Sequence, residues 1–241
     1  MGHARTRPVW AVTAVATASV ASLLTGAVAT RWDAGGPFLA AVGVTLVVET
    51  VVFRRANGRV SDRGPQPFTL PTLVTAVRGA AVAVLAGFVV AGRPGDLLAW
   101  LPALLFAGEA LLDAVDGALA RATGTTSAFG ARLDTEADAL ALLVGSVVAV
   151  RFGAAPVLYL AVGFARYGFV AGLAVRRYRG NPVSDLPERE SRRSLAAAQM
   201  LVLAAVLVPA LEPTLSRLLA TAGMVPFLLG FARDWLLVTR G

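Results

Sequence analysis

Long apolar segments alternate with short polar ones along most of the chain. An α-helix of about 20 apolar residues crosses the roughly 30 Å of hydrocarbon in a lipid bilayer. We therefore predict an all-α, polytopic membrane protein with about eight spans. The apolar segments are residues 11–30, 38–53, 71–92, 97–120, 133–150, 155–175, 195–211 and 218–238.

The first segment could also be read as a secretory signal, because Arg5 and Arg7 precede it. The apolar region of such a signal is usually roughly 7–15 residues long. We interpret the longer segment 11–30 as a retained membrane helix. The second segment, 38–53, is the shortest and carries Glu49.

The composition supports a membrane protein. Apolar residues make up 56% of the 241 residues and charged residues only 15%, whereas a soluble domain carries about 25% charge. The chain has no cysteine and one histidine, His3. Disulfides, thiolate catalysis and zinc–thiolate sites are therefore excluded, and a metal site would use oxygen ligands.

The positive charge of the chain is distributed unevenly among the loops. The formal net charge is +7, and every basic residue is an arginine. If the N-terminus is cytoplasmic, the outside loops hold only Arg31, Arg93, Arg151 and Arg217, and the other loop arginines lie inside. We predict an integral membrane protein with both termini on the cytoplasmic side, in contact with anionic lipids. Nucleic-acid binding is not expected, because the arginines are divided among separate loops.

A polar, basic segment at residues 54–67 separates two apolar segments from the six that follow. Its glycine, proline and asparagine residues favour turns and loops. We predict two parts. Residues 1–66 form an N-terminal two-helix membrane extension and linker, and residues 67–241 form a six-helix membrane domain.

The acidic residues are sparse except between positions 109 and 138, where six of them lie. Residues three or four apart share a helix face, so the spacing predicts two acidic faces on two neighbouring antiparallel helices. Ionised carboxylates cost about 2.5–3.5 kcal/mol each at the centre of a membrane helix. A divalent cation such as Mg²⁺ relieves that cost and takes oxygen ligands. The acidic residues are Glu109, Asp113, Asp116, Asp134, Glu136 and Asp138.

Two explanations that involve no ligand account for part of this pattern of acidic residues. Arg121 and Arg132 are candidates to pair with the aspartates, and Asp134 suits the N-terminal end of a helix. These explanations cover one or two carboxylates but not four on two facing stripes. Two metal ions about 3.5–4 Å apart are a common device for displacement at phosphorus.

Residues 113–138 read D-A-V-D-G-A-L-A-R, then eight residues, then G-A-R-L-D-T-E-A-D. It resembles the signature of the CDP-alcohol phosphotransferase (CDP-alcohol phosphatidyltransferase) family, D-x2-D-G-x2-A-R-x8-G-x3-D-x3-D, with every spacing kept. Members of that family are six-helix integral membrane enzymes, so the resemblance implies that residues 67–241 are the catalytic domain. The matching residues are Asp113, Asp116, Gly117, Ala120, Arg121, Gly130, Asp134 and Asp138.

The resemblance implies a reaction and a set of roles. A phosphatidyl or similar phosphoryl group would pass from a CDP-linked lipid donor, such as CDP-diacylglycerol, to an alcohol, releasing CMP. Asp113, Asp116 and Asp134 would hold two Mg²⁺ or Mn²⁺ ions. Asp138 would be a further ligand and the catalytic base. The family also implies a homodimer.

The resemblance further implies which residues contact the nucleotide. Gly117, Ala120, Arg121 and Ser127 are its candidates in the signature region. A second, weaker match is P-N-x2-T-x2-R, in which Thr75 and Arg78 are nucleotide contacts and Thr72 replaces the asparagine. These residue contacts are expectations from the resemblance alone.

The acceptor alcohol is suggested by arginines near the sixth apolar segment. Arg166 lies within it, and Arg176 and Arg177 lie at its end, which would suit a phosphorylated polyol such as glycerol phosphate or inositol phosphate. Positive-inside anchoring explains Arg176 and Arg177 equally well. The alternatives to an enzyme are a divalent-cation transporter and a non-catalytic relative. A transporter would spread its carboxylates through the membrane depth, whereas these gather at one face.

Overall fold

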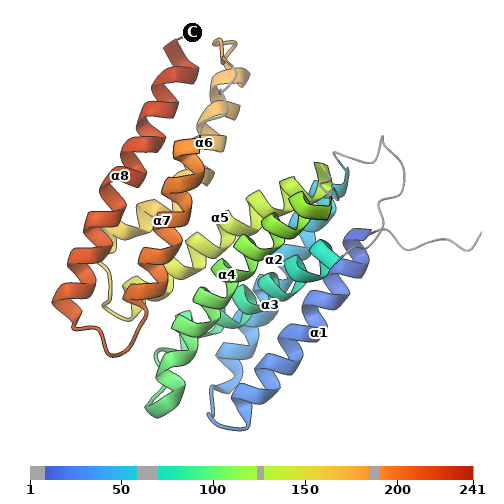
Figure 1. Ribbon diagram of the computed structural model, residues 1–241, viewed down its shortest axis with the longest axis vertical. Coiled ribbons are helices and arrows are strands. Elements are labelled where there is room, and N and C mark those ends of the chain that lie inside the picture. The colour runs from blue at the N-terminus through green and yellow to red at the C-terminus, as the bar shows by residue number, and fades with distance from the viewer. Residues whose placement is uncertain (1–8, 59–69, 124–127, 185–189, 241) are drawn as a thin grey trace, which may run out of the picture. The chain divides into compact units, whose positions relative to one another are not determined.

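The structure is a computed structural model that describes residues 9–58, 70–123, 128–184 and 190–240 (Figure 1). Across these ranges it is all-α, with eight α-helices and no strand. The predicted fold class is therefore confirmed. The helices are α1 (Val9–Ala29), α2 (Gly35–Gly58), α3 (Leu70–Ala91), α4 (Leu101–Thr123), α5 (Ala128–Arg151), α6 (Leu160–Tyr178), α7 (Glu190–Val206) and α8 (Pro213–Arg240), with short 3-10 helices η2 (Asp96–Trp100) and η3 (Val157–Tyr159) before α4 and α6.

Within the described ranges, six segments are long and apolar enough to cross a membrane, so the chain is an integral membrane protein. These segments lie in α1, α2, α3, η2 with most of α4, η3 with α6, and α8. Two predicted spans fall short by this measure. Helix α5 carries three carboxylates in its first half, and α7 has only 17 residues, or about 25 Å of helix.

The ends of the helices follow from local chemistry. Gly92 comes directly after α3 with a positive φ of 84°, and its N–H donates a hydrogen bond to the carbonyl of Phe88, 3.0 Å away. This left-handed residue closes the helix, as glycine commonly does at a C-terminus. Helix α7 ends at Val206 rather than at the predicted residue 211. Pro209 follows, and the residue before a proline is pushed out of the helical region.

The chain folds as two compact units, each with its own packing. The first contains residues 1–94 and 108–141, and the second contains residues 95–107 and 142–241. Helices α4 and α5 each contribute one part to either unit.

Helix α3 is the centre of the first unit. It packs against both α1 and α2, which also pack against each other (Figure 1). In its apolar span 72% of residues are buried, compared with 28% in the spans of α1 and α2. Small side chains allow this close approach. A Cβ on Gly87 would lie 2.8 Å from Cζ of Phe38, so only glycine fits there.

An aromatic group closes one end of this packing. The rings of Trp32 and Phe88 stack with centroids 5.6 Å apart, and Phe38 meets both of them edge-on. At the other end of α1, a small apolar cluster joins Val9 to Phe53 of α2 and Leu133 of α5. The helix pair α1–α2 is thus anchored at both ends within the first unit.

In the second unit, α8 packs against α6 and α7. One buried polar contact there is made by Gln199 of α7, which donates a short hydrogen bond to the hydroxyl of Tyr159. Gly172 lies against Trp235, whose ring would be 2.7 Å from a Cβ at that position. Gly172 therefore serves the packing of α6 against α8.

Candidate active site

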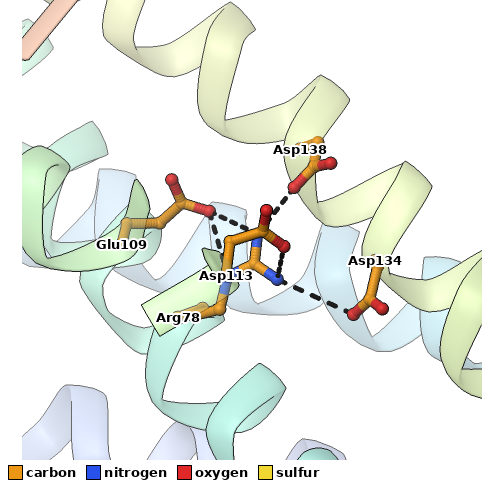
Figure 2. Close-up of polar contacts among 5 residues, drawn as sticks. All are labelled: Arg78, Glu109, Asp113, Asp134 and Asp138. Carbon is orange, nitrogen blue, oxygen red and sulfur yellow. Dashed lines mark hydrogen bonds and ion pairs between the residues drawn. The ribbon is translucent and has the colours of Figure 1, made fainter. Parts of the chain in front are cut away.

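An arginine with no exposed side-chain surface lies at the centre of the acidic residues (Figure 2). Arg78 comes from α3, and four carboxylates from α4 and α5 surround its guanidinium group. We call these five residues the carboxylate cluster, and all of them belong to the first unit. The distances are 2.8 Å from Nη2 to Oε1 of Glu109, 2.7 Å from Nη1 to Oδ1 of Asp113, 3.7 Å from Nη1 to Oδ1 of Asp134, and 2.6 Å from Nη2 to Oδ1 of Asp138.

Helical periodicity explains how the cluster forms. Glu109 and Asp113 are four residues apart on α4, and Asp134 and Asp138 are four residues apart on α5. Each pair therefore occupies one face of its helix. Arg78 projects between the two faces and donates to both, as Figure 2 shows.

The cluster is sealed on one side and open on the other. Arg78 and Glu109 are 0% and 1% exposed, whereas the side chains of Asp113, Asp134 and Asp138 are 36%, 37% and 32% exposed. The buried pair makes two hydrogen bonds, because Nε and Nη2 of Arg78 both donate to Oε1 of Glu109. The three aspartates thus form a rim that a ligand can reach, and Arg78 and Glu109 form the buried floor beneath it.

The charges of the cluster do not balance. If ionised, four carboxylates carry four negative charges, and Arg78 supplies one positive charge. Buried or half-buried charges of one sign are costly unless they are compensated. The three negative charges that remain favour the binding of cations or of a positively charged ligand at the open rim.

The donor set fits a hard divalent cation. The rim offers carboxylate oxygens, which are the ligands that Mg²⁺ prefers in proteins. Among the side chains that the structure describes, no three acidic groups are placed to hold a metal ion as they stand, since Arg78 lies between them. The side chain of Asp116, the remaining predicted ligand, lies outside the described set.

The predicted nucleotide contacts are divided. Thr75 and Arg78 both lie on the buried face of α3, with Thr75 only 3% exposed. Arg78 contacts carboxylates, and its role toward a nucleotide stays a prediction. Of Gly117, Ala120 and Arg121, on the last turns of α4, only the backbone is described, and Ser127 lies outside the described residues.

The predicted acceptor-binding arginines belong to the second unit. Arg166 is half-buried in the middle of α6, and Arg177 is exposed at its end. Arg176 donates from Nη2 to the carbonyls of Pro182 and Thr239, at 3.2 and 3.3 Å. Arg176 therefore joins the end of α6 to the end of α8.

Two acidic residues are buried in the described part of the first unit, and no functional role was predicted for either from the sequence. Glu109 holds Arg78, and its position four residues before Asp113 inside an apolar segment was the available signal. Glu49 of α2 is buried, with 3% exposure. Its signal was equally plain, because a charge inside an apolar segment of a membrane protein is costly.

Comparison with models of protein families gives a match over residues 68–232, to the model described as CDP-alcohol phosphatidyltransferase. The matched range covers more than half of the chain and contains all five residues of the carboxylate cluster. Neither the curated proteins nor the solved structures gave a match. Helices α1 and α2 precede the matched range.

Proposed function

The chain belongs to the CDP-alcohol phosphatidyltransferase family, and on that premise we propose that it transfers a phosphatidyl or similar phosphoryl group from a CDP-linked lipid to an alcohol, with release of CMP. The observation that carries the proposal is the convergence of Glu109, Asp113, Asp134 and Asp138 on Arg78. Three of these carboxylates are open to a ligand, and all of them lie in the matched range.

We assign the metal-binding role to Asp113, Asp116 and Asp134, with Asp138 as a further ligand. Two divalent cations, Mg²⁺ or Mn²⁺, would supply positive charge next to the donor pyrophosphate and the departing CMP. The excess of negative charge in the cluster supports this assignment. The half-exposed side chains of Asp113 and Asp134 support it as well, because they can turn toward a bound ion.

Asp138 is the proposed general base. A base must lie within hydrogen-bonding reach of the proton it removes, and a carboxylate that is 32% exposed can meet the hydroxyl of an acceptor. Its Oδ1 accepts a hydrogen bond from Nη2 of Arg78 at 2.6 Å. This bond fixes one oxygen and leaves the other available to the acceptor.

The substrates are proposed from the remaining residues. Gly117, Ala120, Arg121, Ser127 and Thr75 would hold the nucleotide. A phosphorylated polyol such as glycerol phosphate or inositol phosphate would use Arg166, Arg176 and Arg177. We further propose a homodimer, with both termini and the active site on the cytoplasmic side, where the arginines of the loops are concentrated.

Release of CMP tests the proposal directly. The purified protein in detergent is given CDP-diacylglycerol, Mg²⁺ or Mn²⁺, and each of a panel of alcohols that includes glycerol phosphate and inositol phosphate. Acceptor-dependent CMP is the expected result. The proposal is wrong if no acceptor yields CMP, or if Asp138→Ala keeps full activity.

A further inference from the structure

Glu49 brings a buried carboxyl group from the N-terminal helix pair to the backbone of α3. Its Oε2 lies 3.2 Å from the position that a Cβ on Gly79 would take, and Cγ2 of Thr17 lies equally close to that position. Helices α1, α2 and α3 therefore meet at Gly79, the residue directly after Arg78. The absence of a side chain at Gly79 is what lets Glu49 approach the carboxylate cluster.

A small cavity lies between Glu49 and the cluster. Glu49, Thr75, Arg78, Glu109 and Glu136 are among the residues that line it. The space open to the centre of a water molecule is about 10 Å³, which is just enough for one water. The cavity is therefore too small for a substrate but suits a single ordered water.

Two carboxylate oxygens at this cavity lack a hydrogen-bond donor. Oε2 of Glu49 and Oε2 of Glu109 are both buried and have no hydrogen-bond partner among the described residues, and the two side chains are 3% and 1% exposed. A buried polar atom without a partner is destabilising. One water molecule can donate two hydrogen bonds and so satisfy both oxygens.

The position of Glu49 is fixed by its surroundings. Phe53, one turn further along α2, packs with Val9 of α1 and with Leu133 of α5. Leu133 directly precedes Asp134 of the cluster. Helix α2 is thus held against α1 and against α5, which is one of the helices that border the cavity.

We propose that Glu49 is a positioning residue of the active site: it holds a water molecule in this cavity together with Glu109 and thereby fixes Arg78. The connection continues through Oε1 of Glu109, which accepts from Nε and Nη2 of Arg78, to Asp138. The effect on catalysis rests on the proposed function, whereas the link between Glu49 and Glu109 does not. The N-terminal pair would therefore complete a site whose other residues lie in the matched range.

Three variants of α2 separate positioning from structural support. Glu49→Leu removes both oxygens, Glu49→Gln keeps the shape and the hydrogen-bonding capacity, and Thr45→Val is the control. Thr45 lies one turn before Glu49, is also buried in α2 with 9% exposure, and its hydroxyl donates a hydrogen bond to the carbonyl of Ala41. We expect Glu49→Leu to lower kcat for CMP release by about tenfold or more, with KM for CDP-diacylglycerol nearly unchanged, because small misplacements at a reacting centre cost up to about 100-fold.

Glu49→Gln should recover most of that loss, and Thr45→Val should behave like the unmodified protein. The proposal is overturned if Glu49→Leu keeps the original kcat, or if all three variants lose activity in parallel with thermal stability. Recovery of kcat in Glu49→Gln together with a loss of kcat in Glu49→Leu supports the proposal. A role in packing alone would not lower kcat while leaving KM nearly unchanged.

A thermal double-mutant cycle tests the link without relying on activity. Glu49→Leu, Glu109→Gln and the double variant are compared by their Tm in detergent. Two groups that share one water should couple, so the shift of the double variant should differ from the sum of the single shifts by about 2 °C or more. Additive shifts would contradict the shared water. If the protein releases no CMP with any acceptor, the proposed function fails, but this cycle still decides the link.

Discussion

Arg78 and Asp138 are joined by a hydrogen bond of 2.6 Å although they are 60 residues apart in the chain. One partner is completely buried and the other is about one third exposed. The arginine is therefore a fixed support, and the aspartate is the part that can face a substrate. Substitutions at the buried floor and at the open rim of the cluster should therefore have different effects.

Asp138→Asn should remove the proposed base while keeping the hydrogen bond to Arg78, because the amide oxygen still accepts. We expect kcat for CMP release to fall by about 10²–10⁴-fold, the usual contribution of a general base, with little change in Tm. Glu212→Gln is the control, since Glu212 is an exposed residue of the second unit, away from the carboxylate cluster and the cavity, and it should retain most activity. Substantial activity in Asp138→Asn would assign the base elsewhere.

Arg78→Met should destabilise the protein severely, because four carboxylates would lose the cation that they share. Removing one partner of a buried ion pair costs about 3–5 kcal/mol, so a low folded yield and a lower Tm are expected. Arg78→Lys keeps the charge but cannot donate in the same forked geometry. Its Tm should lie between that of Arg78→Met and that of the unmodified protein. The measurement is Tm by size-exclusion chromatography after heating.

The control for Arg78 is Arg31→Lys, in a short loop segment where the side chain is exposed. It should leave Tm unchanged. If Arg78→Met were as stable as the unmodified protein, the cluster would not depend on the arginine for its charge balance.

Removal of divalent cations should abolish CMP release, and Mg²⁺ or Mn²⁺ should restore it. A ligand that binds only the folded state stabilises it, by about 2.7 kcal/mol at 100 times its Kd. Mg²⁺ should therefore raise the Tm of the unmodified protein, and Asp113→Asn should reduce this increase. An equal increase in both proteins would show that Asp113 is not a ligand.

Gly87→Ala should lower stability through steric overlap alone. The added methyl group would meet the ring of Phe38, and overpacking of this kind costs about 1–3 kcal/mol, or a few degrees of Tm. Gly43→Ala in α2 is the matched control, because a Cβ there meets nothing within 4 Å. Phe38→Leu in the Gly87→Ala background should restore part of the loss, and no recovery would argue against the overlap.

Periodicity and apolar length were enough to predict most of the architecture. They located eight helices and placed Glu109 and Asp113 on one face and Asp134 and Asp138 on another. They were less accurate for α7, which begins at Glu190 rather than at residue 195. An apolar pattern marks the membrane-facing part of a helix, and polar residues such as Arg192 and Arg193 can extend the same helix beyond it.

The role of Arg78 as the centre of the cluster could not be predicted in this way. It lies 31 residues before Glu109 and 60 before Asp138, and helical spacing gives no information about contacts between helices so far apart in sequence. The contact of Glu49 with Gly79 was beyond prediction for the same reason. Its burial, by contrast, was foreseeable from its place in an apolar segment.

The order of synthesis gives the position of Arg78 a consequence for membrane insertion. Arg78 leaves the ribosome before any of the carboxylates that bind it, and an arginine at the centre of a membrane helix costs about 2.5–3.5 kcal/mol. We expect α3 to settle at its final depth only after α4 and α5 have been made. Glu49 of α2 is synthesised before Arg78, and in the finished fold the two residues line the same cavity.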